Sequence, residues 1–121
     1  MLFDHLAGMK WLLAVMSKGK EVSEFFPQVV KNVVVRDIEV KKMVYMYLVQ
    51  YADANDTCRE TALLSVNSFQ KDLIGGNQLI RGLALRVLTS FRVPDIIQIQ
   101  VFAVRRCAED QSPYVRKCAA H

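Results

Sequence analysis

The sequence predicts an all-α protein in which pairs of helices stack side by side into a solenoid. The composition supports this class, because apolar residues make up 52% of the 121 residues while only five glycines and three prolines occur. A short motif recurs three times along the chain. Each copy is followed by apolar residues at the 3.6-residue spacing of a helix face, and no stretch favours a strand.

The recurring motif marks the start of a helix in each repeat. Its three copies read DIEVKKMV, NQLIRGLA and SPYVRKCA, with apolar anchors at intervals of 40 and 35 residues. The anchors are Val40, Ile80 and Val115. Three positions before them stand Asp37, Asn77 and Ser112, whose side-chain oxygens suit the orphan amides of a first helical turn. Pro113 fits the first helical position after Ser112, where a missing N–H costs nothing.

The residues after each cap form one apolar stripe. The first stripe is Val40, Met43, Val44, Tyr47, Leu48 and Tyr51, and the second is Ile80, Leu83, Ala84, Val87, Leu88 and Phe91. The third copy supplies only Val115, Cys118 and Ala119. Paired helices at this spacing are typical of a HEAT or armadillo-type α-α superhelical solenoid. The incomplete third stripe predicts a fragment of a longer array.

Two helices are expected before the first repeat motif. The first helix carries an apolar row that ends at Gly19, a residue favoured just past a helix end. The row consists of Leu2, Leu6, Met9, Leu13 and Met16. A second helix is expected through Val34, capped by Ser23 or Phe26, with Pro27 tolerated in its first turn.

Second helices are expected to close the later hairpins. Residues 61–73 place an apolar row on one helix face, and Pro94 opens a segment that runs to about Glu109. The row of the former consists of Ala62, Val66, Phe69 and Leu73. Leu63 is expected to turn aside from this row, near a surface edge. About seven helices are therefore predicted, and residues 1–121 are interpreted as a single helical-repeat segment.

Charge and cysteine content exclude several classes of protein. The net charge of +4 is mild, and no basic run is interleaved with aromatic residues, so no nucleic-acid partner is expected. Lys10 and Lys18 interrupt the apolar stretch near the start, which argues against a secretory signal or a spanning helix. Cys58, Cys107 and Cys118 lack CxxC or metal-ligand spacing and indicate free thiols in the cytosol.

The sequence contains no constellation of catalytic residues. A catalytic site needs converging titratable groups, and the two histidines, His5 and His121, stand near opposite ends of the chain. The Gly75-Gly76 pair lacks the lysine and hydroxyl residue of a phosphate-binding loop and is interpreted as a turn. We therefore expect no enzyme activity, no cofactor and no metal.

Basic residues recur at one repeat position, occupied by Lys41, Arg81 and Arg116. The favoured interpretation is a ladder that pairs with turn acids of neighbouring repeats, and the alternative is a basic stripe for phosphate groups. A second basic set is either a solvated face or a contact for membrane headgroups. That set is Lys10, Lys18, Lys20 and Lys31. The aromatic residues Tyr45, Tyr47 and Tyr51 are expected to pack in the core.

Five blocks stand in order along the chain: KGKEVSEFFPQVVKNV, IEVKKMVYMYLVQYA, ALLSVNSFQKDL, NQLIRGLALRVL and SPYVRKCAAH. Together they resemble the N-terminal trunk of the beta-adaptins, the beta subunits of clathrin-adaptor complexes, from about Met9 to the end. FFPQVVKNV, the RVP at 92–94 and SPYVRKCAAH are most similar to the beta subunits of adaptor protein complex 3. Two features depart from the family: Gly75-Gly76 replaces a frequent Asp-Pro, and residues 53–60 predict a longer inter-helix loop.

The resemblance implies a non-enzymatic scaffold subunit of a heterotetrameric vesicle-coat adaptor. Such a subunit serves cargo sorting and intracellular protein transport from Golgi or endosomes toward lysosome-related organelles. The implied partners are the delta-type large, medium and small subunits, and the implied location is cytoplasmic, peripheral on Golgi and endosomal membranes and coated vesicles. The alternative is an unrelated helical-repeat binding scaffold such as a nuclear transport carrier.

The resemblance also suggests a partner-binding patch. Beta trunks of related adaptors are recruited by small GTPases of the Arf class, which dock on early helices. Matching VKKMVYMYL and ALLSVN residue by residue gives Lys41, Met46, Leu63 and Val66 as the predicted patch. The alternative, from the core pattern, is that Val66 packs inside and Lys41 joins the ladder.

Overall fold

A computed structural model describes residues 5–120, and this part of the chain is helical without a strand. Its α-helices are α1 (His5–Ser17), α2 (Phe26–Val30), α3 (Ile38–Tyr51), α4 (Asp56–Leu64), α5 (Val66–Leu73), α6 (Gln78–Leu88), α7 (Ile97–Ala108) and α8 (Pro113–Ala120). Three 3₁₀ segments accompany them: η1 (Ser23–Phe25), η2 (Lys31–Val34) and η3 (Pro94–Ile96). The predicted all-α fold is confirmed for the described residues.

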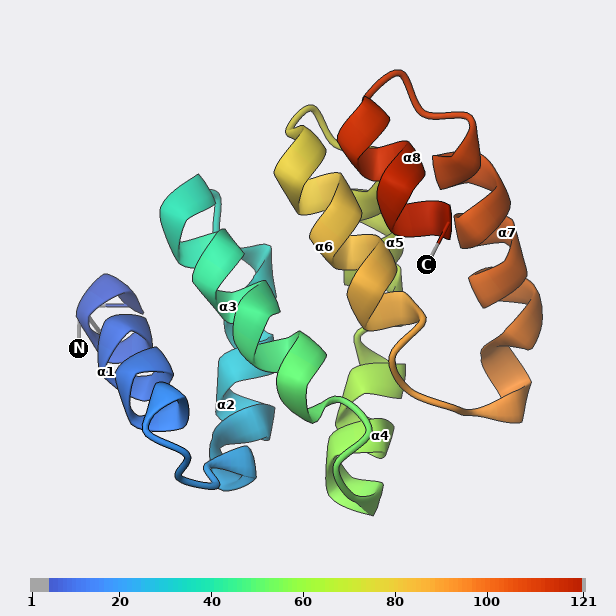
Figure 1. The fold of residues 1–121 in the computed structure, drawn as a ribbon. Helices are drawn as coiled ribbons and strands as arrows, with labels where there is room; N and C mark the ends of the chain where they lie inside the picture. The colour runs from blue at the N-terminus through green and yellow to red at the C-terminus, as the bar shows by residue number, and fades with distance from the viewer. Residues whose placement is uncertain (1–4, 121) are drawn as a thin grey trace.

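The helices form two layers that run along the solenoid (Figure 1). One layer contains α1, α3, α6 and α8, each in contact with the next. The other contains α2, then α4 with α5, then α7, and these also contact in succession. Helix α6 is central, because it packs against α3, α5, α7 and α8. The arrangement is that of stacked helical hairpins, as the repeat predicts.

The three predicted caps start their helices. Asp37 and Asn77 each accept hydrogen bonds from the amides two and three residues ahead, at 2.9 to 3.3 Å. The hydroxyl of Ser112 accepts from the amide of Val115 at 3.4 Å, and Pro113 is the first residue of α8. A cap of this kind contributes about 1 kcal/mol. The caps therefore fix the starts of α3, α6 and α8.

The predicted stripes form the core. All six residues of the second stripe are buried, and so are those of the first except Met43, which is partly buried. Val115 is buried, whereas Cys118 and Ala119 are partly so. In α1, Met9 is buried together with Leu12, a residue that the predicted row omits. Leu2 of that row, like His121, lies outside the described residues.

Two tyrosines of α3 fix the connection between α1 and α2. The hydroxyl of Tyr47 donates to the carbonyl of Val22 at 2.5 Å, and the Val22 amide donates to the Tyr51 hydroxyl at 3.3 Å. Tyr45, Tyr47 and Tyr51 are all buried, which confirms their predicted packing role. Gly19 ends the preceding turn with a positive φ of 84°, the conformation that favours glycine at this position.

The predicted helix over residues 61–73 is wrong in its extent and continuity. Helix α4 already begins at Asp56, so the loop expected over residues 53–60 is shorter than predicted. Ser65, with φ −103° and ψ 9°, ends α4 and begins α5. The break lets α4 pack on α2 while α5 packs on α6 and α7. It also raises the number of α-helices in the described residues from about seven to eight.

The predicted cap of the second helix is also wrong. Neither Ser23 nor Phe26 caps a helix by its side chain. The amide of Ser23 instead donates a hydrogen bond to Glu21 Oε1 at 2.8 Å. The segment from Ser23 to Val34 is a succession of η1, α2 and η2. Pro27 lies in the first turn of α2, where its lack of an N–H is tolerated as predicted.

Close contact between α6 and α8 depends on Gly82. A Cβ atom at this position would lie 2.7 Å from the ring of Tyr114, closer than atoms in contact approach.

Among the described helices, none is both long and apolar enough to cross a bilayer.

Candidate functional site

Two of the three recurring cations reach across to acids near the ends of α5 and α7, at the edge where α3, α6 and α8 begin. The ammonium group of Lys41 lies 2.8 and 2.9 Å from the two carboxylate oxygens of Asp72, near the end of α5. The buried hydroxyl of Tyr45 donates to the same carboxylate at 2.5 Å. Burial, and then Asp72 beside it, raises the pKa of Tyr45 well above its usual range. Asp72 thus accepts hydrogen bonds from both the ammonium group of Lys41 and the buried hydroxyl of Tyr45.

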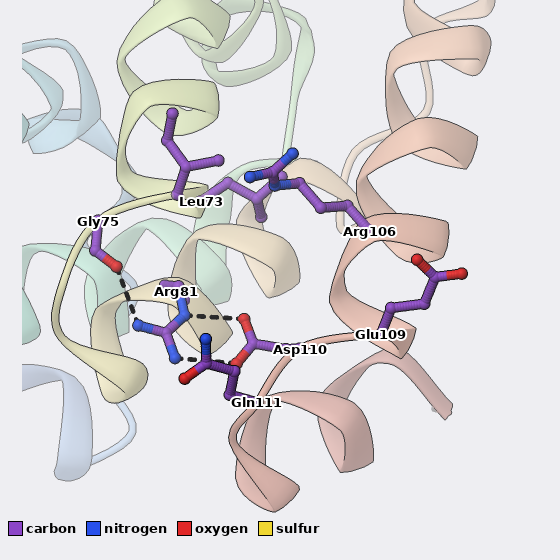
Figure 2. Close-up of a pocket in the computed structure, with 8 residues that line it drawn as sticks. Leu73, Gly75, Arg81, Arg106, Glu109, Asp110 and Gln111 are labelled. Atoms are coloured by element: carbon purple, nitrogen blue, oxygen red, sulfur yellow. Dashed lines mark hydrogen bonds and ion pairs between the residues drawn. The ribbon is translucent and has the colours of Figure 1, made fainter.

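The second rung joins α6 to the turn after α7 (Figure 2). Nε and Nη2 of Arg81 donate to the two carboxylate oxygens of Asp110 at 2.8 and 2.9 Å. Nη1 donates to the carbonyl of Gly75 at 2.9 Å. Asp110 also accepts from the Ser112 amide at 2.8 Å. The hydrogen bonds from Arg81 hold the pKa of Asp110 below its usual value.

Arg116, the third recurring cation, has only main-chain partners in the described residues. Its Nη1 donates to the carbonyls of Asp110 at 2.7 Å and Gln111 at 3.0 Å. The predicted pairing of the recurring cations with acids is therefore confirmed for Lys41 and Arg81, but the acids lie 31 and 29 residues ahead, within the same repeat rather than in a neighbouring one as predicted. Those two cations are mostly neutralised by their acids, which disfavours the alternative of a phosphate-binding stripe.

Two neighbouring clefts lie beside the rungs along this edge. The first cleft, of about 350 Å³, lies between the η2–α3 junction and the α5–α6 turn, next to the Lys41–Asp72 pair. The second, of about 450 Å³, surrounds the Arg81–Asp110 pair and is walled by α7 (Figure 2). Gly75 lines both clefts. We call the two clefts together the edge groove.

The structure separates the four residues of the predicted patch. Met46 is exposed on α3, and Leu63 is partly buried in a cleft with Arg92 to Pro94. Val66 is only 6% exposed and belongs to the core. The side chain of Lys41 is 13% exposed and bonded to Asp72. The four residues therefore do not form one accessible patch, and Val66 is corrected to a core residue.

The exposed leucine of this region is not the predicted one. Leu64 is 86% exposed, whereas Leu63 packs partly against the core. Counted from the buried Ala62, Leu64 lies on the opposite face of α4 and Leu63 lies to its side. Binding through Met46 and Leu63 stays a prediction.

Two of the three cysteines are buried. Cys58, Cys107 and Cys118 are free thiols, as predicted. Burial raises the pKa of the Cys58 and Cys107 thiols, which keeps them protonated near neutral pH. Within the residues that the structure describes, no group of three or more His, Cys, Asp or Glu side chains is arranged to hold a metal ion.

The fold and the ladder define a class of protein, the helical-repeat proteins built from stacked α-α hairpins. Residues 5–121 match the model of the adaptin N terminal region, and the chain belongs to this family. It is 53% identical over 117 residues to the AP-3 complex subunit beta of Dictyostelium discoideum, a match that covers 97% of this chain and 10% of that protein.

Two mammalian relatives give the same picture. The chain is 53% identical over 116 residues to AP-3 complex subunit beta-2 of Mus musculus and 52% identical over 116 residues to AP-3 complex subunit beta-1 of Homo sapiens. Each match covers 96% of this chain and 10% of the relative, so the chain spans about a tenth of the length of these proteins. The resemblance to beta-adaptins of adaptor complex 3 is confirmed, which favours it over the nuclear transport alternative.

Proposed function

We propose that the chain is a non-enzymatic scaffold segment of the beta subunit of a heterotetrameric vesicle-coat adaptor. The observation that carries this proposal is its identity of 52 to 53% with AP-3 beta subunits over nearly its whole length. The stacked hairpins support it, because a solenoid offers extended surfaces to several partners at once. Residues 1–121 act in this proposal as a single helical-repeat segment.

The proposed mechanism is multivalent binding. Delta-type large, medium and small adaptor subunits hold the complex together, and individually weak contacts are reinforced when the complex sits on a membrane. The proposed work is cargo sorting from Golgi or endosomal membranes toward lysosome-related organelles. The proposed location is cytoplasmic and peripheral on those membranes and on coated vesicles.

Co-purification tests this assignment. A tagged chain expressed in cells should retain the delta-type, medium or small adaptor subunits, detected by mass spectrometry. The Asp72→Ala variant disturbs the contact between α3 and α5, because Asp72 bonds Lys41 and Tyr45, and should retain less of them. Recovery of Ran or nuclear cargo in place of adaptor subunits would contradict the proposal.

We further propose that a small GTPase of the Arf class docks near Met46 and Leu63. The exposed Met46 and the apolar cleft that contains Leu63 support this, since both offer apolar surface outside the core. Leu63→Glu should abolish binding of the GTP-loaded form, measured by pull-down, while the chain stays folded. Leu64→Glu is the matched control, because the adjacent leucine is fully exposed yet lies outside the cleft. Equal binding by both variants would sink the idea.

A further inference from the structure

We propose that the edge groove binds an extended acidic peptide segment that carries aliphatic side chains. The proposal goes beyond the adaptor assignment and does not depend on it. It rests on the charges, the apolar walls and the open shape of the groove.

The charged side chains that line the groove without an ion pair give it a net positive charge. Lys41 and Arg81 are neutralised by Asp72 and Asp110. Three further cations line the groove and have no ion pair within the described part of the chain. They are Arg36 and Lys71 in the first cleft and Arg106 in the second. A partner that complements this surface carries carboxylates.

The distribution of charge is uneven along the groove. The first cleft has the unpaired cations Arg36 and Lys71, and no unpaired acid lines it. In the second cleft, the guanidinium of Arg106 extends from α7 toward Leu73, while the carboxylate of Glu109 lies on the outer side, away from Arg81 (Figure 2). The first cleft is therefore the stronger site for an acidic side chain.

Each cleft is lined by exposed aliphatic side chains, two in the first cleft and one in the second. Val34 is 70% exposed, Ile38 is 40% exposed and Ile74 is 60% exposed, and all three line one of the two clefts. Exposed aliphatic side chains bordered by charge are typical of a protein-binding site. Aliphatic side chains of a partner would remove these residues from water.

The shape of the groove fits a peptide better than a membrane. Both clefts are concave, and a flat bilayer surface cannot enter them. Three unpaired cations are also fewer than the clusters of about four to eight basic residues that favour anionic lipids. Between the clefts stand Gly75 and Gly76, and a Cβ built on Gly76 meets no atom within 4 Å. We call this open position at Gly75-Gly76 the saddle. Without side chains, it leaves room for a peptide backbone to pass from one cleft to the other.

The binding test uses a fluorescein-labelled peptide in which glutamate alternates with leucine, titrated with the 121-residue chain and followed by anisotropy. Two control peptides replace glutamate by lysine or leucine by serine. We expect the first peptide to bind, the affinity to fall as salt is raised, and both control peptides to bind more weakly. Phosphatidylserine vesicles are tested in parallel by co-sedimentation.

Matched variants locate the binding on the chain. Lys71→Glu and Arg36→Glu should each weaken the affinity at least about fivefold. Lys10→Glu, on the exposed side of α1, makes the same change of charge outside the groove and should have little effect. Ile74→Ser should weaken binding more than Leu64→Ser, which removes an exposed leucine outside the groove.

A further variant tests the groove itself rather than its charge. Gly76→Leu places a side chain on the saddle in a backbone conformation that accepts it, since its φ is not positive. It should weaken peptide binding without changing the net charge. Thermal unfolding confirms that every variant is folded.

Several results would overturn the proposal. Equal losses from Lys71→Glu and Lys10→Glu would mean general electrostatic attraction. Undiminished binding by Gly76→Leu, or of the serine peptide, would exclude the groove. Vesicle binding that is lost in Lys71→Glu, without peptide binding by the native chain, would identify a lipid surface instead. None of these results bears on co-purification with adaptor subunits, so the two proposals fail separately.

Discussion

The two rungs of the ladder join the two helix layers by different chemistry at the same repeat position. Lys41 offers a compact ammonium group, and the buried Tyr45 hydroxyl completes the coordination of Asp72. Arg81 offers a planar fork that covers Asp110 and reaches a main-chain carbonyl as well. The acids also come from different places, because Asp72 lies within α5 and Asp110 lies beyond the end of α7. The repeat therefore fixes the position of the cation, whereas the type of cation, the place of the acid and the additional hydrogen bonds differ between the two rungs.

The largest difference between the rungs should appear when their acids are removed. Asp72→Ala leaves a mostly buried ammonium and a buried hydroxyl without their acceptor, and should lower the free energy of unfolding by about 3 kcal/mol. Asp110→Ala should cost about half as much, since Arg81 keeps its bond to Gly75. Urea unfolding measures both. Equal losses would show that Tyr45 adds nothing to the first rung.

Two groups of the rungs, Tyr45 and Asp110, should lose their contributions to stability at opposite ends of the pH range. The raised pKa of Tyr45 means that its contribution is present below about pH 10, the ordinary value for tyrosine, and is lost as the pH rises further. The lowered pKa of Asp110 means that its contribution is present above about pH 4 and is lost as the pH falls. Each loss should approach a slope of about 1.4 kcal/mol per pH unit for one proton.

Single variants assign these slopes. Tyr45→Phe should reduce the loss of stability in alkali and leave the acid limb unchanged, and Asp110→Asn should do the reverse. The measurement is the free energy of urea unfolding across the pH range. A variant that changes both limbs alike would contradict the separation of the two rungs.

Exchange of the cation should have a smaller effect. Arg81→Lys keeps the charge but loses the paired bonds to Asp110 and the bond to Gly75, and should cost about 1 kcal/mol. Thermal or urea unfolding measures it. No loss of stability would mean that charge alone holds the second junction.

The smallest effect is expected at Arg116. This exposed side chain bonds only to main-chain carbonyls, so Arg116→Ala should change the free energy of unfolding by less than about 0.5 kcal/mol. A loss as large as that of Arg81→Lys would show that a carbonyl contact suffices to stabilise the ladder position.

Local signals in the sequence predict much of the fold. Asp37, Asn77 and Ser112 mark helix starts because a cap acts on the amides next to it. The break at Ser65 was not predicted, because Ala62, Val66 and Phe69 keep the spacing of one continuous helix across it. The break depends instead on which neighbours α4 and α5 meet in space.

The candidate site was predicted less completely. The cation position of the ladder is visible in the repeat, whereas its acids, Asp72 and Asp110, stand at different places relative to the next cap. Arg36, Lys71 and Arg106 share no repeat position, so only the folded chain brings them to one groove. One sequence feature could have indicated these acids: although their spacing differs, both stand a few residues before the following helix cap.

The carbonyl bond of Arg81 has a consequence for how the solenoid assembles. Arg81 bonds to the carbonyl six residues before it, and Arg116 makes the same local contact. Each guanidinium is thereby restrained by its own capping turn, independently of any carboxylate. A free arginine side chain carries about 2 kcal/mol of rotamer entropy, and this restraint removes part of it early. A carboxylate then binds a guanidinium group that is already oriented, so forming the ion pair costs less side-chain rotamer entropy.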